Sequence, residues 1–127
     1  MLVKNAKEIL AFKTAGGIKL PPDEMLSELF FEAILYVSNK CVPSELLRST
    51  DSTDRVYRLV EGGHFICYPD KPNFKSENEH LMIDEDLTYA VINYVAFIIN
   101  QDPFYRTLSL ETIADFNANE GRVFDYE

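Results

Sequence analysis

Two cysteines and two histidines carry most of the reactive side-chain chemistry of this chain: Cys41, Cys67, His64 and His80. A thiol beside an imidazole base can act as a nucleophile, but neither cysteine stands at a predicted helix start, where a thiol is activated. His64 and Cys67 lie three residues apart on a predicted strand. They therefore face opposite sides and cannot reach one metal ion. We predict no catalytic residue, no metal site and no cofactor.

Three consecutive carboxylates, Asp84, Glu85 and Asp86, form the other cluster with chemical potential. Neighbouring carboxylates can serve as acid and base or bind a cation, but negative charge is also favoured at a helix N-terminus. The apolar run that follows makes the helix start a sufficient explanation, and Asp84 is expected to cap exposed N–H groups there. A further turn, Glu61-Gly62-Gly63, lacks the lysine of a phosphate-binding loop, so we predict no phosphate site.

The carboxylates open the element around which the chain is organised, the helix predicted over residues 84–101 (DEDLTYAVINYVAFIINQ). It is apolar on almost every side, so other elements must cover it. Its apolar part is shorter than the about 20 residues that span a bilayer. Only Asp86, Asn93 and Asn100, spaced by sevens, form a polar stripe. This stripe is either a seam in solvent or a contact with another subunit.

The remaining elements follow from periodicity and from turn residues. Gly62 and Gly63 separate two apolar-rich strands and tolerate the positive φ of a tight hairpin turn. A proline after Asp102 marks the start of the last helix. In order, we predict helices over 3–15 and 23–40, a helical turn at 43–47, strands over 56–60 and 64–68, the central helix, and a helix from 103 to Gly121.

The predicted fold class is mainly α: a small helical bundle around a buried central helix, with one β-hairpin. The length of 127 residues suits a single domain over residues 1–127. We divide it into an N-terminal helix and link, a helical core that contains the hairpin, and an extended C-terminal tail; these segments cover 1–20, 21–121 (hairpin 55–69) and 122–127.

The charge balance limits the possible partners. The chain has 21 acidic and 12 basic residues, a formal net charge of −9. This charge disfavours sequence-specific binding to nucleic acid and attachment to an anionic membrane. Residues 1–13 lack the apolar core of a secretion signal, so we expect synthesis in the cytoplasm with both cysteines as free, buried thiols.

The order of these elements resembles a family of small head–tail adaptor (connector, or neck) proteins of tailed bacteriophages and prophages. The resemblance covers the chain from about Leu20 onward. It rests on the helix PPDEMLSELFFEAILYVSNK, the short PSELL segment, the strand–turn–strand VYRLVEGGHFICYP, the block LMIDEDLTYAVINYVAFIINQDPFY, and the final helix through TIADFNANEG.

The resemblance implies a non-enzymatic virion structural protein that is made in the host cytoplasm and then built into the virion. Its subunits would form a homo-oligomeric ring beneath the portal protein, join the capsid to tail or neck proteins, and let DNA pass through. It maps portal binding onto the tail residues Arg122, Val123, Phe124 and Tyr126. Candidate subunit contacts are the polar stripe (Asp86, Asn93, Asn100) and the hairpin turn (Gly62, Gly63).

Two other classes of function stay open. A soluble acidic binding antagonist, such as an immunity protein or a DNA mimic, would place its carboxylates on one exposed face. In this sequence the acids are spread through every segment. A small enzyme would use His64 or His80 with a nearby carboxylate, and replacing both histidines by alanine would test that role.

Overall fold

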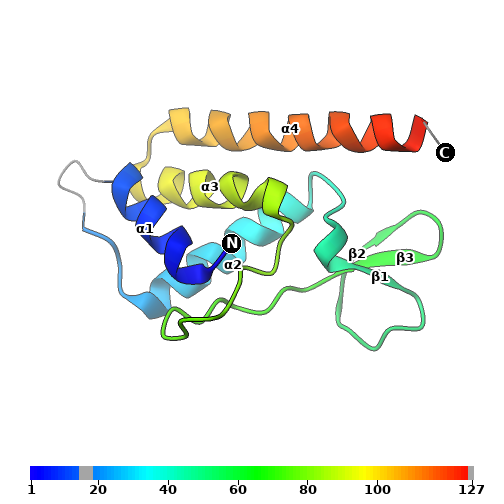
Figure 1. Ribbon diagram of the computed structural model, residues 1–127, viewed down its shortest axis with the longest axis horizontal. Helices are drawn as coiled ribbons and strands as arrows, with labels where there is room; N and C mark the ends of the chain where they lie inside the picture. The colour runs from blue at the N-terminus through cyan, green and yellow to red at the C-terminus, as the bar shows by residue number, and fades with distance from the viewer. Residues whose placement is uncertain (15–18, 126–127) are drawn as a thin grey trace.

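Helix α3 (Thr88–Asn100) is the centre of the molecule. The computed structural model describes residues 1–14 and 19–125, with side chains as far as residue 119. Within it, α1 (Val3–Lys13), α2 (Asp23–Ser38) and α4 (Pro103–Asp125) all contact α3 (Figure 1). Seven of the thirteen residues of α3 are buried. The predicted buried central helix is confirmed.

The ends of the helices follow local chemistry. A 3₁₀ turn, η2 (Glu85–Leu87), precedes α3, and Gln101 ends α3 with a left-handed φ of 58°. The Asp102 carboxylate accepts the N–H of Phe104 at 3.0 Å, which confirms the predicted cap at the start of α4. Asp84 caps no group of α3. That prediction is wrong, because the carboxylate of Asp84 is engaged elsewhere.

Three antiparallel strands form a small sheet at the end of the molecule opposite the C-terminus of α1 (Figure 1). β3 (His64–Cys67) lies in the middle, between β1 (Leu47–Ser49) and β2 (Val56–Val60). The predicted hairpin β2–β3 is confirmed, and Gly62 and Gly63 have φ angles of 82° and 73°. These angles are costly for residues with a Cβ.

The predicted fold class is wrong. Helices make up 55% of the structure and a three-stranded sheet 12%, so the fold is mixed α/β instead of a helical bundle with one hairpin. The missed strand is β1, which follows the 3₁₀ turn η1 (Ser44–Leu46) directly. It has three residues, none of them β-branched, and is held by pairing with β3 instead of by a preference of its own.

The extended tail predicted for residues 122–127 is wrong as far as Asp125, because α4 continues to that residue. Gly121 was expected to end the helix. A glycine inside a helix costs only about 1 kcal/mol relative to alanine, too little by itself to stop one. Tyr126 and Glu127 lie outside the described residues, as do Gly16 and Gly17, the predicted end of the first helix.

Candidate functional site

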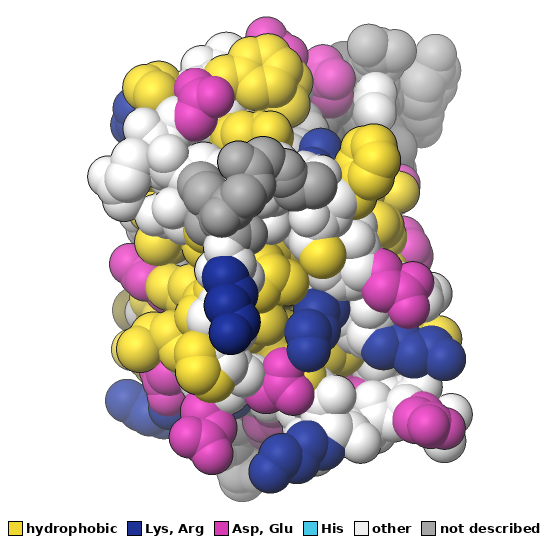
Figure 2. All heavy atoms as spheres, turned by 90° about the vertical axis from the view of Figure 1, so that its left-hand side faces the viewer, with side chains coloured by type: hydrophobic (Ala, Val, Ile, Leu, Met, Phe, Trp, Pro, Cys, Tyr) yellow, Lys and Arg dark blue, Asp and Glu magenta, His cyan; other side chains and the backbone are white. Residues whose placement is uncertain are grey.

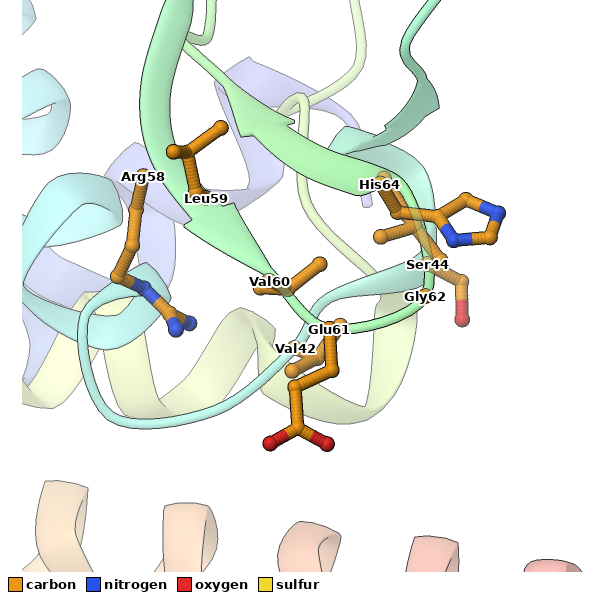
Figure 3. Close-up of a pocket in the computed structure, with 9 residues that line it drawn as sticks. Val42, Ser44, Arg58, Leu59, Val60, Glu61, Gly62 and His64 are labelled. Atoms are coloured by element: carbon orange, nitrogen blue, oxygen red, sulfur yellow. The ribbon is translucent and has the colours of Figure 1, made fainter.

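An open groove with a volume of about 940 Å³ lies along one face of the sheet and is lined mainly by apolar surface. The backbone of α4 runs past it on the side toward which Glu61 points (Figure 3). Its described lining residues come from the segment before β1, from the strands and from the hairpin turn: Val42, Ser44, Leu47, Arg58, Leu59, Val60, Glu61, Gly62 and His64.

The strand register places four of these side chains on one face. Residues directly opposite each other in an antiparallel sheet point to the same side. Leu47 and Arg58 both pair with Ile66, and Val60 pairs with His64. Since all but the buried Ile66 line the groove, this face of the sheet forms its floor.

Arg58 fastens the groove to the helical layer. Its Nη2 donates to the carbonyl oxygens of Ser38 at 2.9 Å and Cys41 at 2.7 Å, at the C-terminal end of α2. Free carbonyls at a helix C-terminus attract cations, which explains why the Arg58 guanidinium lies at the end of α2. The Nε of Arg58 is buried and has no hydrogen-bond partner among the described residues. The groove wall therefore includes a guanidinium that also anchors the sheet.

The rim of the groove is formed by exposed residues of the hairpin. Glu61 and His64 are exposed on either side of the two turn glycines. Leu59, in the edge strand β2, is 74% exposed, and Val56 at the other end of β2 is also exposed. An edge strand with exposed apolar side chains and unpaired backbone groups is a typical place for another chain to bind.

The residues singled out for chemistry are not brought together. Cys41 and Cys67 are both buried, whereas His64 and His80 are both exposed. Burial raises the pKa of the Cys67 thiol, so this thiol stays protonated at neutral pH. Among the described residues, no three His, Cys, Asp or Glu side chains are grouped as a metal site would need.

The Asp84 carboxylate has a structural partner 40 residues away. Its two oxygens accept the N–H groups of Ser44 at 2.8 Å and Glu45 at 2.7 Å, the start of η1. Asp84 thus joins the start of the central helical segment to the segment that leads into β1. The other two carboxylates of this cluster, Glu85 and Asp86, are exposed.

The predicted polar stripe does not form a continuous exposed seam. Asp86 is exposed and Asn100 is half-buried, but Asn93 is only 5% exposed. Its Oδ1 accepts no hydrogen bond from the described residues. The inward position of Asn93 follows from the packing of helices on nearly every side of α3. In the single chain, Asn93 is not available for a subunit contact.

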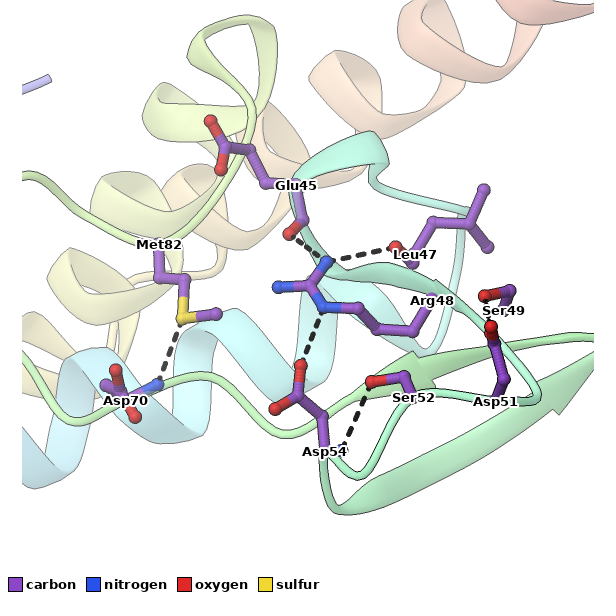
Figure 4. Close-up of polar contacts among 9 residues, drawn as sticks. All are labelled: Glu45, Leu47, Arg48, Ser49, Asp51, Ser52, Asp54, Asp70 and Met82. Atoms are coloured by element: carbon purple, nitrogen blue, oxygen red, sulfur yellow. Dashed lines mark hydrogen bonds and ion pairs between the residues drawn. The ribbon is translucent and has the colours of Figure 1, made fainter.

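A second group of polar contacts fixes the connection between β1 and β2 (Figure 4). The Arg48 Nε donates to Asp54 at 2.8 Å, and its Nη1 donates to the carbonyl of Glu45 at 2.9 Å. The hydrogen bond to Asp54 raises the pKa of Arg48. The hydroxyl of Ser49 donates to Asp51, which lowers the pKa of that carboxyl. These contacts hold a turn in place and assemble no reactive group.

The tail residues to which portal binding was assigned are only partly described. Arg122, Val123 and Phe124 have backbone positions within α4, and their side chains lie outside the described residues. Sequence reasoning did not predict the groove, because Leu47 joins the hairpin residues only through the pairing of β1 with β3, and β1 was not predicted. The glycine turn was the one sequence signal that pointed to its rim.

The described residues define a small mixed α/β domain with an open, mainly apolar groove on its sheet. None of the described helices is long and apolar enough to cross a lipid bilayer. Comparison of the chain with protein-family models, with curated protein sequences and with solved structures finds no match to any of them.

Proposed function

We propose that this protein is a head–tail adaptor subunit of a tailed phage or prophage, a non-enzymatic structural protein that forms a ring beneath the portal. The proposal starts from the sequence resemblance, and one structural observation carries it further. That observation is the open apolar groove beside an edge strand, with Leu59 and Val56 exposed next to it. Exposed apolar surface that borders a hollow is typical of protein–protein contact.

A closed ring needs two different surfaces on each subunit, because each copy contacts its two neighbours differently. The groove and the hairpin turn with Gly62 and Gly63 supply one of them. The C-terminal part of α4, which contains Arg122, Val123 and Phe124, is the proposed contact with the portal. The net charge of −9 suits a ring through which DNA slides, since like charge keeps the DNA from adhering.

The acidic binding antagonist is the alternative. Residues 77–86 contain five carboxylates and no lysine or arginine. Three of them are engaged within the chain: Glu79 accepts the N–H of Asn73 at 3.0 Å, Asp84 accepts the N–H of Ser44 at the start of η1, and Glu85 forms an ion pair with the N-terminal ammonium group. They are therefore less free to mimic the phosphates of a nucleic acid, and we retain the adaptor as the proposed function.

Electron microscopy tests the proposal directly. Purified protein is incubated with portal assemblies from the same phage or prophage, and an added ring of density beneath the portal is expected. A chain truncated after Gly121 should keep the fold, by circular dichroism, and lose the ring. Portal particles without added density would refute the adaptor role. A truncated chain that still docks would refute the assignment of portal binding to residues 122–127.

A further inference from the structure

Phe12 is the most exposed of the large apolar side chains among the described residues, with 83% of its surface accessible. It lies in the last turn of α1. The end of the molecule at which α1 ends faces the viewer in Figure 2, and hydrophobic side chains gather on that face with lysines or arginines among them. Phe104, at the start of α4, is 58% exposed. Exposed aromatic side chains are frequent anchors of protein–protein contacts.

Two charged residues of α1, Glu8 and Lys13, lie close to Phe12 along the helix. Lys13 follows Phe12, and the Lys13 ammonium lies 5.9 Å from the ring centroid of Tyr105, a long contact that leaves the charge available. Glu8 lies one helical turn before Phe12 and is exposed. The surface around Phe12 therefore presents an aromatic ring with charges of both signs beside it.

The groove on the sheet has the complementary properties. Its apolar floor contains Leu47 and Val60, its rim carries the exposed carboxylate of Glu61, and its wall carries the Arg58 guanidinium. Arg58 donates to backbone carbonyls and has no ion pair with a described carboxylate. The two surfaces are complementary. The Phe12 ring matches the apolar floor, Lys13 is opposite in charge to Glu61, and Glu8 is opposite in charge to Arg58.

We infer that the occupant of the groove is a second copy of this chain, with Phe12 inserted against Leu47 and Val60 and Lys13 paired with Glu61. The groove and the C-terminal end of α1 lie at opposite ends of the long axis of the molecule (Figure 1). A chain cannot fill its own groove in this way. The contact is head-to-tail, so each copy binds the next one. The copies form a closed ring when the last copy binds the first.

This inference rests on the proposed ring, for which it supplies the subunit interface. In the ring, Phe12 of each subunit enters the groove of the next. The anionic bilayer, another surface that binds aromatic and lysine side chains, fits less well because the chain as a whole carries a net charge of −9.

Cysteine cross-linking tests the contact. The full chain with Phe12→Cys and Val60→Cys is oxidised mildly at high concentration and examined on a non-reducing gel. The native Cys41 and Cys67 are buried and should not compete. We expect a ladder of dimers, trimers and larger species, because each molecule has one introduced thiol at each end. Disulfides form only where the two Cα atoms approach within about 7 Å, so the ladder reports this contact.

The matched control carries Lys4→Cys with Val60→Cys. Lys4 is exposed on the same helix but two turns away from Phe12. It should give little cross-linking. A ladder of equal strength from the control, or only dimers from the Phe12→Cys and Val60→Cys chain, would overturn the inference.

Charge reversal provides a second test. Lys13→Glu alone and Glu61→Lys alone should each lower the yield of the cysteine ladder by about tenfold, and the two together should restore it. Failure of the pair to restore the ladder would refute the Lys13–Glu61 contact. If the chain with Phe12→Cys and Val60→Cys adds a ring to portal particles but forms no disulfide between subunits, this interface is overturned and the adaptor function stands. A ladder without portal binding would support the interface and refute the adaptor.

Discussion

Replacing Asp84 by alanine should destabilise the protein by about 1–2 kcal/mol. The Asp84 carboxylate accepts two backbone N–H groups, from Ser44 at 2.8 Å and Glu45 at 2.7 Å. A hydrogen bond to a charged group is worth roughly 1.5–3 kcal/mol when well shielded. The two hydrogen bonds to Asp84 are exposed to solvent. Removing a side chain that caps a helix costs about 0.5–2 kcal/mol, and this range is the better estimate here. The melting temperature should fall by about 4–8 °C.

A double-mutant cycle tests which N–H groups are involved. Ser44→Pro removes one of the two donors. A proline suits the first position of a helical turn, and the preceding Pro43 has an extended ψ of 131° that tolerates it. In the Ser44→Pro background, Asp84→Ala should cost less, with a coupling energy of about 0.5–1 kcal/mol.

Urea denaturation monitored by circular dichroism supplies the free energies of unfolding. Asp86→Ala is the matched control, since Asp86 is an exposed carboxylate two residues further on, and should change stability by no more than about 0.5 kcal/mol. Our reasoning would be refuted if the Asp84→Ala and Ser44→Pro effects simply added, or if Asp86→Ala were as destabilising as Asp84→Ala.

Three further predictions concern groups in the interior. Arg58→Met should lower the free energy of unfolding by about 2–3 kcal/mol in urea, since two carbonyls at the end of α2 lose their donor, and a loss under about 0.5 kcal/mol would contradict this. Burial raises the pKa of the Cys67 thiol, so the unfolded chain gives up this proton first. The stability from this group is therefore present below about pH 9 and decreases above it; in the native protein neither Cys67 nor Cys41 should react with a thiol reagent at about pH 8. Asn93→Leu should leave the melting temperature unchanged or raise it, because it removes a buried oxygen without a described partner, whereas Asn93→Asp should lower it.

The parts of the fold that local sequence determines were predicted well. The apolar faces of α2 and α3 repeat at helical spacing, and the two glycines mark a turn that nearby residues alone define. The Asp102 cap is likewise local, since donor and acceptor lie two residues apart. Helical periodicity and turn chemistry are short-range signals, so one sequence suffices to find them.

The errors arose where contacts join segments far apart in the chain. β1 exists because it pairs with β3, 15 or more residues later, and Leu47 has no strand preference that would announce this. Asp84 has the position of a helix cap, yet its partners lie about 40 residues earlier. Asn93 belongs to a polar stripe in sequence, but helices cover α3 on that side too. The groove depends on the same long-range pairing, which explains why only its glycine turn was foreseen.

In the described part of the chain, β1 and β2 are the two edges of the sheet, and unpaired strand edges favour uncontrolled polymerisation into fibrils. Two features of this sheet counter that risk. The first edge is only three residues long, and the second has an irregular register between Val56 and Arg58, which bends its row of backbone groups. A long, flat stack of sheets is therefore disfavoured.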